Sequence, residues 1–332
     1  MKKFLKKLSQ TATIGLCTAG LAFSASAATK IRISSPAVPE DWHARMWDVF
    51  KAELEKEMPG HFDVEVHLNS TLFKQEAELT ALQRGNLDVA LLSAQQYSKQ
   101  LPDWTVFTAG YLIRSPGHQK NVFDGEIGKE FFKLTEDKMK IHPVAVLYLG
   151  TRQLNLRADQ KITTPSDLNG IKLRMPGSDA WQFLGRALGA SPTPMAFSEV
   201  YTGLQTGAID GQDNPLSTDR AAKFYEVTKQ IVLTDHLVDG IFITFSGRKW
   251  DKYNDEEKSA LEKASFAARD YNNENRIKEE AELVAFFKEQ GLDVYKPDQQ
   301  AFRDTVQKAY LESDFSKDWP EGIVDRVNAI AD

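Results

Sequence analysis

The acidic and histidine side chains of the sequence include two pairs that could carry chemistry. Asp210 and Asp213 are close enough in the chain to act as a general acid and base, but a tight turn with solvated or capping carboxylates explains the pair better. His61 and His67 flank the start of a predicted strand and could hold a metal ion, although such histidines are more often surface or hydrogen-bonded core residues. Neither pair is specific enough to predict a catalytic or metal centre.

Sequence signatures of the common enzyme classes are missing. The chain has no Gly-x-Gly-x-x-Gly after a strand, no Gly-x-x-x-x-Gly-Lys-Ser/Thr, no His-Glu-x-x-His and no Gly-x-Ser-x-Gly. Gly203, Gly207 and Gly211 are spaced by four residues, but they fall on a predicted helix and its exit, where a turn and close packing explain them. We therefore expect a protein that is not an enzyme and needs no cofactor.

The composition describes a globular chain with room for two domains. Of the 332 residues, 42% are hydrophobic and 27% are charged, which excludes disordered and collagen-like chains. The 41 Lys and Arg against 47 Asp and Glu give a net charge of -6, whereas a nucleic-acid-binding surface needs a surplus of basic residues. A protein with this charge must bind any anion through a local site.

The first 27 residues have the organisation of a secretory signal peptide. Lysines cluster at the start, residues 11–23 are uncharged and mostly apolar, and Ala25-Ser26-Ala27 is a small-x-small cleavage site. The apolar run is too short to span a membrane, so we expect cleavage after Ala27 and an exported protein that is not itself membrane-embedded. Cleavage would also remove Cys17, the only cysteine, and leave a net charge of about -10.

Strands and helices alternate along the predicted mature chain. Residues 30–33 read as a strand, a helix follows Pro39, and further strands cover 64–68 and 87–92 around a helix at 75–84. The pattern restarts with a strand at 141–149 that ends at Gly150, a turn at 165–170, a strand at 171–176, a helix at 181–188, and another helix that begins near Ser198 as its N-cap. This alternation predicts an α/β fold with a mainly parallel sheet and helices on both faces.

A long helical segment covers residues 255–290 without Pro or Gly. Its apolar residues form one stripe, made of Leu261, Ala264, Ala267, Tyr271, Ile277, Ala281, Val284 and Phe287. A single helix of this length would reach about 50 Å and could brace two lobes. The alternative is two helices broken near residues 272–275, where Asn lowers helix propensity. The predicted lobe I is 28–149 plus about 240–279, and lobe II is 150–239 plus about 280–332.

Three segments carry a resemblance to a known family. Residues 188–216 read LGASPTPMAFSEVYTGLQTGAIDGQDNPL, residues 167–176 read DLNGIKLRMP, and residues 150–153 read GTRQ. With the order of elements from Ile31 to the C-terminus, they resemble the substrate-binding proteins of tripartite ATP-independent periplasmic (TRAP) transporters. The resemblance implies a two-lobed periplasmic binding protein of the Venus flytrap type. It also implies delivery of a small organic acid to the small and large membrane subunits of a TRAP permease.

The resemblance also assigns ligand-binding residues on one lobe. Arg174, in the Lys-x-Arg-x-Pro strand, matches an arginine that meets the ligand carboxylate, and Arg152 matches a second arginine that contacts the carboxylate or neighbouring oxygens. A guanidinium suits this role because its planar pair of donors fits a carboxylate. Asn214 matches an asparagine of the family motif, and Phe197 an aromatic that packs on the ligand. Asp213 departs conservatively from the usual Glu.

Contacts from the other lobe are expected near the ends of its predicted strands. Trp42 and His43 follow the first strand and Ser93 follows the third, while Gln75 and Glu76 could supply acceptors for hydroxyls. Trp42 could equally be a core residue. A Trp and a His together suit the hydroxyls and faces of a sugar better than a small keto acid. We therefore expect a sugar acid such as a hexuronate or aldonate, with a C4-dicarboxylate or sialic acid as alternatives.

A function of another class remains open from the residues alone. An exported hydrolase or lyase acting on acidic sugars could use Asp210, His236 or Glu76 as acid and base. Such an enzyme would need these groups to meet in one cavity, which the structure can test.

Overall fold

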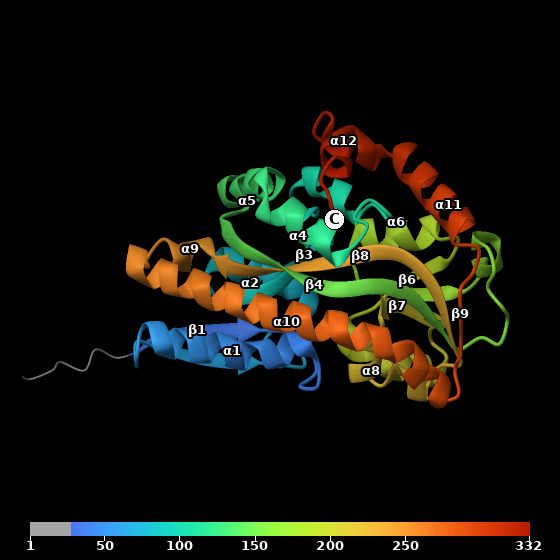
Figure 1. Ribbon diagram of the computed structural model, residues 1–332, viewed down its shortest axis with the longest axis horizontal. Coiled ribbons are helices and arrows are strands. Elements are labelled where there is room, and N and C mark those ends of the chain that lie inside the picture. Colours follow the sequence, from blue (N-terminus) through green and yellow to red (C-terminus); the bar gives the residue numbers. More distant parts are fainter. Residues whose placement is uncertain (1–27) are drawn as a thin grey trace, which may run out of the picture.

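One nine-stranded sheet runs through the computed structural model, which describes residues 28–332 (Figure 1). The predicted signal peptide and its cleavage site after Ala27 lie outside these residues. The strands follow in the order β2 (Phe62–His67), β1 (Thr29–Ser34), β3 (Val89–Ser93), β8 (Gln230–Ser246), β4 (Ile141–Leu156), β7 (Gly211–Pro215), β5 (Lys172–Met175) and β6 (Ser191–Pro194), and β9 (Asp293–Tyr295) pairs with β8.

The sheet is parallel in its two outer parts and antiparallel at its centre. Strand β1 pairs in parallel with β2 and β3, and β5 does so with β6 and β7. At the centre, β8 and β4 pair with each other in antiparallel orientation, and β8 pairs likewise with β3 and β4 with β7. The predicted α/β class is confirmed, but the prediction of a mainly parallel sheet is wrong at the centre. Pairing between strands depends on tertiary contacts that a local hydrophobic pattern does not encode.

The prediction that the strand beginning at Ile141 ends at Gly150 is wrong, because strand β4 continues to Leu156. Gly150 has a φ of +130°, a conformation that side chains other than glycine rarely adopt, and the strand register shifts between Tyr148 and Gly150. A Cβ atom at this position would lie 2.4 Å from Cβ of Pro215. Glycine therefore lets β4 pass close to the end of β7 instead of stopping there.

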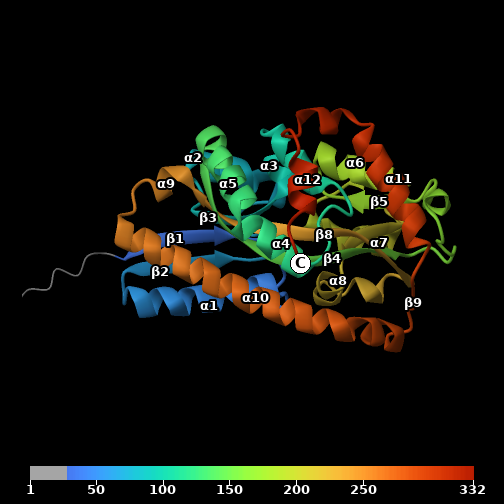
Figure 2. The ribbon, with the colours of Figure 1, turned by 45° about the horizontal axis from the view of Figure 1, so that its top comes forward.

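Helices cover both faces of the sheet. Figures 1 and 2 show α1 and α10 on one face and α4, α5, α6, α11 and α12 on the other. The helices are α1 (Trp42–Glu57), α2 (Glu78–Arg84), α3 (Ala94–Tyr97), α4 (Pro116–Asp124), α5 (Glu126–Met139), α6 (Asp179–Ala187), α7 (Val200–Thr206), α8 (Leu216–Ala221), α9 (Gly247–Trp250), α10 (Asp255–Glu289), α11 (Gln299–Leu311) and α12 (Ile323–Asn328). Short 3-10 turns include η1 (Gln75–Ala77), η3 (Pro165–Leu168) and η4 (Phe197–Glu199). The prediction of Ser198 as an N-cap is wrong, because Ser198 lies inside η4 and Glu199 is the residue that precedes α7.

Helix α10 is a single helix of 35 residues, as the absence of Pro and Gly predicted. Its start is fixed by a capping box, in which the side chains of Asn254 and Glu257 each accept the other residue's backbone N–H. The predicted apolar stripe is wrong in its middle, since Ile277 is 47% exposed and the buried stripe passes through Asn272 and Arg276 instead. Buried polar groups need partners, so this part of α10 faces a polar region of the fold.

Helix α1 packs against the first part of α10 and positions the residues that precede it. Asp41 caps α1 by accepting the backbone N–H of His43 at 2.9 Å. The buried face of α1, which includes Trp47 and Phe50, meets Leu261 of α10 in one apolar cluster. Burial of each such side chain contributes about 1.5–3 kcal/mol, so the first turn of α1 is held firmly in place.

The two outer parts of the sheet are joined by continuous elements. Strands β4 and β8 and helix α10 each extend from the β1–β3 side to the β5–β7 side (Figure 1). The predicted lobe boundaries, near residues 149, 240 and 280, stay predictions. Within residues 28–332, no helix is both long enough and apolar enough to cross a membrane.

Candidate functional site

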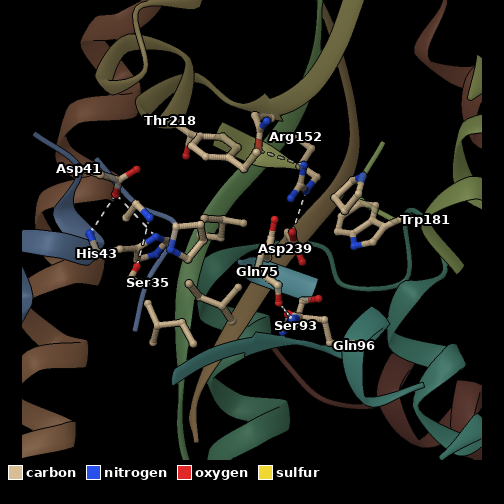
Figure 3. A pocket seen from close by; sticks show the side chains of 18 of the residues that line it. Ser35, Asp41, His43, Gln75, Ser93, Gln96, Arg152, Trp181, Thr218 and Asp239 are labelled. Carbon is tan, nitrogen blue, oxygen red and sulfur yellow. Dashed lines mark hydrogen bonds and ion pairs between the residues drawn. The ribbon is translucent and has the colours of Figure 1, made fainter. Parts of the chain in front are cut away.

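A cavity of about 80 Å³ opens between the two outer parts of the sheet (Figure 3). Its walls come from the ends of β1 and β3, from β4, β5, β7 and β8, and from the first turns of several helices. The lining residues are Ser35, Pro36, Ala37, Asp41, His43, Gln75, Leu91, Ser93, Gln96, Leu149, Arg152, Arg174, Pro176, Trp181, Phe197, Asn214, Thr218, Asp239 and Ile241. The mixture of apolar walls with a few polar groups is typical of a small-molecule site.

Arg174 on β5 is buried in this cavity with little of its charge compensated. The side chain is 1% exposed, its Nε atom donates to the Met195 carbonyl at 2.9 Å, and its guanidinium lies 5.9 Å from the ring centre of Phe197. Among residues 28–332, its Nη2 atom has no partner and no carboxylate lies within ion-pair distance. Burial lowers the Arg174 pKa to about 10, with Asp213 opposing the shift and Arg152 adding to it.

Arg152 on β4 is buried as well, but two carboxylates compensate its charge. Its Nε donates to Asp239 at 2.7 Å, and its Nη1 donates to the carbonyl of Asp213 at 2.8 Å and to its carboxylate at 3.3 Å. The guanidinium also lies 4.3 Å from the ring centre of Trp181. Burial alone would lower the Arg152 pKa, but Asp213 and Asp239 outweigh it and raise the pKa. Of the two arginines, only Arg174 is left without a counterion.

A chain of side-chain amides fixes the orientation of Asn214 on β7. Arg152 Nη1 donates to Asn214 Oδ1 at 3.2 Å, so the Asn214 amide nitrogen points the other way and donates to Gln212 Oε1. Gln212 in turn donates to Asp219 at 2.7 Å. Burial raises the pKa of Asp219 well above its usual value. The Asn214 side chain is therefore held in one orientation at the cavity wall.

The opposite wall is built around His43 at the start of α1. Figure 3 places His43, Asp41 and Ser35 together on one side of the cavity and Arg152 and Trp181 on the other. His43 is 4% exposed, and its Nε2 atom is buried without a partner in the described part of the chain. Burial lowers the His43 pKa to about 3, and the nearby Arg276 guanidinium adds to this effect while Asp41 opposes it. The imidazole is therefore neutral at physiological pH.

Neutral polar groups form the floor of the cavity. Gln96 accepts the backbone N–H of Ser93 at 3.0 Å and donates to the carbonyl of Gln75 at 3.1 Å. The Gln75 side-chain oxygen is buried and has no partner among the described residues. Figure 3 shows these three side chains side by side below the arginine wall. They offer donors and acceptors but no charge to a bound molecule.

Two of the expected contacts, Trp42 and Glu76, do not line the cavity. Trp42 donates to Glu279 of α10 at 2.8 Å and packs edge-on against Tyr271, which agrees with its alternative role in packing. Glu76 accepts the backbone N–H of Gly177 at 3.2 Å and pairs with Lys99. Glu76 thus links η1 to the segment after β5 instead of facing the ligand space. The remaining seven expected residues, Arg174, Arg152, Asn214, Phe197, His43, Gln75 and Ser93, surround one space.

The residues proposed for acid–base chemistry do not meet in the cavity. Asp213 does not lie in a solvated turn as expected but is fully buried in β7, where it pairs with Arg152 and His236. Asp210 accepts the backbone N–H of Lys172 at 2.9 Å, and neither Asp210 nor His236 lines the cavity. Asp210, His236 and Glu76, the candidates for a hydrolase or lyase, therefore do not form an acid–base pair in this cavity.

His61 and His67 have separate carboxylate partners, Glu257 and Glu65. His61 contacts Glu257 at 2.6 Å instead of His67. Across residues 28–332, no group of three or more His, Cys, Asp and Glu side chains is arranged to hold a metal ion.

The cavity residues that the sequence reasoning missed include Asp239, Trp181 and Thr218. Asp239 lies in the apolar run of β8, where a lone acid is a signal because a buried carboxylate needs a cation. Trp181 looks like an ordinary apolar helix residue, and Thr218 follows the motif without a distinctive spacing. The local pattern gave no reason to place these two at a ligand site.

The fold and sequence match a known family of transport receptors. The family model of bacterial extracellular solute-binding proteins, family 7, matches residues 36–317. A curated relative, the sialic acid-binding periplasmic protein of Vibrio cholerae, is 31% identical over 302 residues, which is 91% of this chain and 94% of that protein.

Two solved structures from Roseobacter denitrificans are also similar. Both are TRAP periplasmic solute-binding proteins. One, with bound 3-deoxy-D-manno-oct-2-ulosonic acid (KDO), is 44% identical, covers 92% of this chain and 100% of that chain, and has a TM-score of 0.88. The other, with bound L-galactonate, is 30% identical, covers 91% and 98%, and has a TM-score of 0.83.

These relatives are solute-binding proteins of transport systems and not enzymes, which excludes the hydrolase or lyase alternative. Receptors of this family are periplasmic and work with membrane permeases. The chain belongs to the family 7 bacterial extracellular solute-binding proteins, the two-lobed substrate receptors of TRAP transporters.

Proposed function

We propose that this protein captures a sugar acid with a single carboxylate, which forms a salt bridge with Arg174. The observation that carries the proposal is the buried, uncompensated guanidinium of Arg174. A buried charge without a partner costs several kcal/mol, and such a cost is tolerated where a ligand supplies the missing charge. A carboxylate also fits the free edge of the guanidinium, which offers parallel N–H donors.

The charges around the cavity favour one carboxylate over two. Arg152 is paired with Asp213 and Asp239, Arg276 behind the His43 wall is paired with Asp41, and His43 is neutral. A second ligand carboxylate would therefore be desolvated without a counterion, which is unfavourable. This supports a monocarboxylate and speaks against a C4-dicarboxylate as the preferred ligand.

The remaining lining suits a chain or ring of hydroxyl groups. Gln75, Gln96, Asn214 and Thr218 present neutral donors and acceptors, and Phe197 presents an apolar face. Such groups pair with hydroxyls and pack on the C–H faces of a sugar. The ligands named for the relatives, KDO, L-galactonate and sialic acid, each combine one carboxylate with several hydroxyls. Their shared chemistry supports a hexuronate, an aldonate or a larger sugar acid of this kind.

We further infer that the mature receptor begins after Ala27 and delivers its ligand to the small and large membrane subunits of a TRAP permease. The sequence of residues 1–27 supports export, and the family assignment supports the partners. Mass spectrometry of the protein purified from periplasm tests the cleavage site.

Calorimetric titration of the mature protein tests the proposed ligand class. The panel contains KDO, L-galactonate, D-galacturonate, sialic acid and succinate, each at equal concentration and pH. We expect at least one sugar acid to bind with a Kd in the micromolar range or below, and succinate to bind at least about tenfold more weakly. Tight binding of succinate with no binding of any sugar acid would refute the proposal.

A further inference from the structure

Arg276, in the middle of α10, uses every one of its hydrogen-bond donors within the protein. It is fully buried. Its Nε donates to Asn272 at 3.2 Å, and its Nη1 donates to the Leu149 carbonyl at 2.7 Å and to the Ser217 hydroxyl at 3.0 Å. Two donor hydrogens remain on Nη2, and these point toward the wall of the cavity that contains His43.

These two hydrogens determine the tautomer of His43. Nη2 of Arg276 donates one hydrogen to Asp41 Oδ1 and the other to His43 Nδ1 at 3.1 Å. A guanidinium has no acceptor and does not lose its proton, so His43 Nδ1 must be the acceptor and carries no hydrogen. Asp41 Oδ1 lies 3.6 Å from Nδ1, too far for a competing hydrogen bond. The single hydrogen of the neutral ring is therefore on Nε2.

The Nε2–H group of His43 is a buried donor without a protein partner. His43 lines the cavity, is 4% exposed, and its Nε2 has no acceptor among residues 28–332. A buried donor in this state costs about 1–3 kcal/mol until an acceptor arrives. Arg276 and Asp41 hold the ring, so the donor has a fixed direction and does not pay for reorientation when a ligand binds.

We propose that His43 is a specificity-determining residue, which donates Nε2–H to an uncharged oxygen of the sugar acid at the wall opposite Arg152. This proposal rests on the proposed function and adds the recognition of the ligand's hydroxyl end. The charged groups that face His43 are Asp41, which precedes α1, and Arg276 of α10, and they neutralise each other. The wall therefore offers a donor without net charge, which selects a hydroxyl or carbonyl oxygen over a second carboxylate.

Affinity measurements with a long and a short acid test the contact. The long acid is the sugar acid of the calorimetric panel that the wild-type protein binds most tightly, and the short acid is glycerate, which keeps the carboxylate but lacks the distant hydroxyls. We expect His43→Phe to weaken the long acid by about tenfold or more and to change glycerate by less than about threefold. His67→Phe, a control outside the cavity on β2, is expected to change neither.

The outcomes separate the two proposals. If no sugar acid of the calorimetric panel binds the wild-type protein, the proposed function fails and the role of His43 fails with it. If His43→Phe binds the long acid within about threefold of wild type, or loses both acids equally, only the role of His43 is refuted.

Nuclear magnetic resonance of the unmodified protein tests the tautomer without any ligand or variant. Long-range ¹H–¹⁵N correlation of His43 should show a neutral ring with its hydrogen on Nε2 from about pH 8 to about pH 5, a range in which an ordinary histidine becomes protonated. A ring with its hydrogen on Nδ1, or one that titrates within this range, would overturn the proposal.

Discussion

Replacement of Arg174 by methionine should separate ligand binding from stability. Met replaces the aliphatic stem of Arg, ends near the position of Nε and carries no charge, so the variant has no buried guanidinium beside Phe197. We expect the Arg174→Met protein to lose affinity for the sugar acid and, without ligand, to be more stable than wild type. Both effects have the same cause, namely that the charge has no counterion until the ligand arrives.

The size of the stability gain follows from the pKa of Arg174. A fall from 12.5 to about 10 corresponds to a cost of about 3 kcal/mol for the charged form, at about 1.4 kcal/mol for each tenfold change in proton affinity. The variant also loses the hydrogen bond to the Met195 carbonyl, which reduces the expected gain in stability by about 1 kcal/mol. The free energy of unfolding should therefore rise by about 1–2 kcal/mol, which urea denaturation of the ligand-free protein can measure.

The expected loss of affinity is larger. Removal of one partner from a buried charge pair costs about 3–5 kcal/mol, which corresponds to two to four powers of ten in Kd by calorimetry. Arg186→Met on the exposed face of α6 is the matched control and should change neither quantity. A variant that binds the acid within about threefold of wild type, or that loses stability along with affinity, would refute the reasoning about Arg174.

Three further predictions concern the cavity walls and the strands that support them. Arg152→Met should lower the free energy of unfolding, measured by urea denaturation, by about 3–5 kcal/mol, because Asp213 and Asp239 would stay buried without their cation. Unchanged stability would show that these two acids are not charged. His43 stays neutral in the folded protein down to about pH 3, whereas the unfolded chain takes up the proton near pH 6.5, so the protein loses stability as the pH falls below 6.5. Between about pH 7 and pH 5 the free energy of unfolding of the wild type should fall by about 2 kcal/mol relative to that of His43→Phe. Equal losses in the two proteins would contradict the assignment of a neutral His43. Gly150→Ala should destabilise the protein by more than about 2 kcal/mol, because the new Cβ would meet Pro215. Gly170→Ala, at another positive φ but with open space around it, should cost only about 1 kcal/mol. Equal costs would mean that β4 and β7 do not pass so closely.

The residues of the arginine wall could be named from the sequence because the three segments of the family resemblance contain Arg152, Arg174, Phe197 and Asn214. Arg174 and Asn214 lie on the short strands β5 and β7, which pair with each other, and Phe197 lies between them in the chain. Arg152 reaches the same wall because β4 pairs with β7. The structure brings these residues around one cavity, and their contact with a ligand stays a prediction.

The wall that contains His43 was less predictable because distant segments assemble it. Arg276 is far from His43 in sequence, and the asparagines that precede it suggested a possible break in the helix. Helix propensity is a weak preference, and here the contacts of Asn272 with Tyr148 and Arg276 override it. Asn272, one of the residues that weakened the helix prediction, accepts a hydrogen bond from Arg276, which in turn contacts His43 in the cavity wall.

The strands shared by both parts of the sheet constrain how a ligand can enter. No flexible linker joins the β1–β3 part to the β5–β7 part along β4 and β8, so any widening of the cavity must bend intact, hydrogen-bonded strands and the helix that lies across them. The three register shifts in β4, the middle one at Gly150, interrupt its ladder and are the places where bending breaks the fewest bonds. We therefore expect the cavity to widen by bending of β4 and β8 at these register shifts and not by movement of a separate hinge loop.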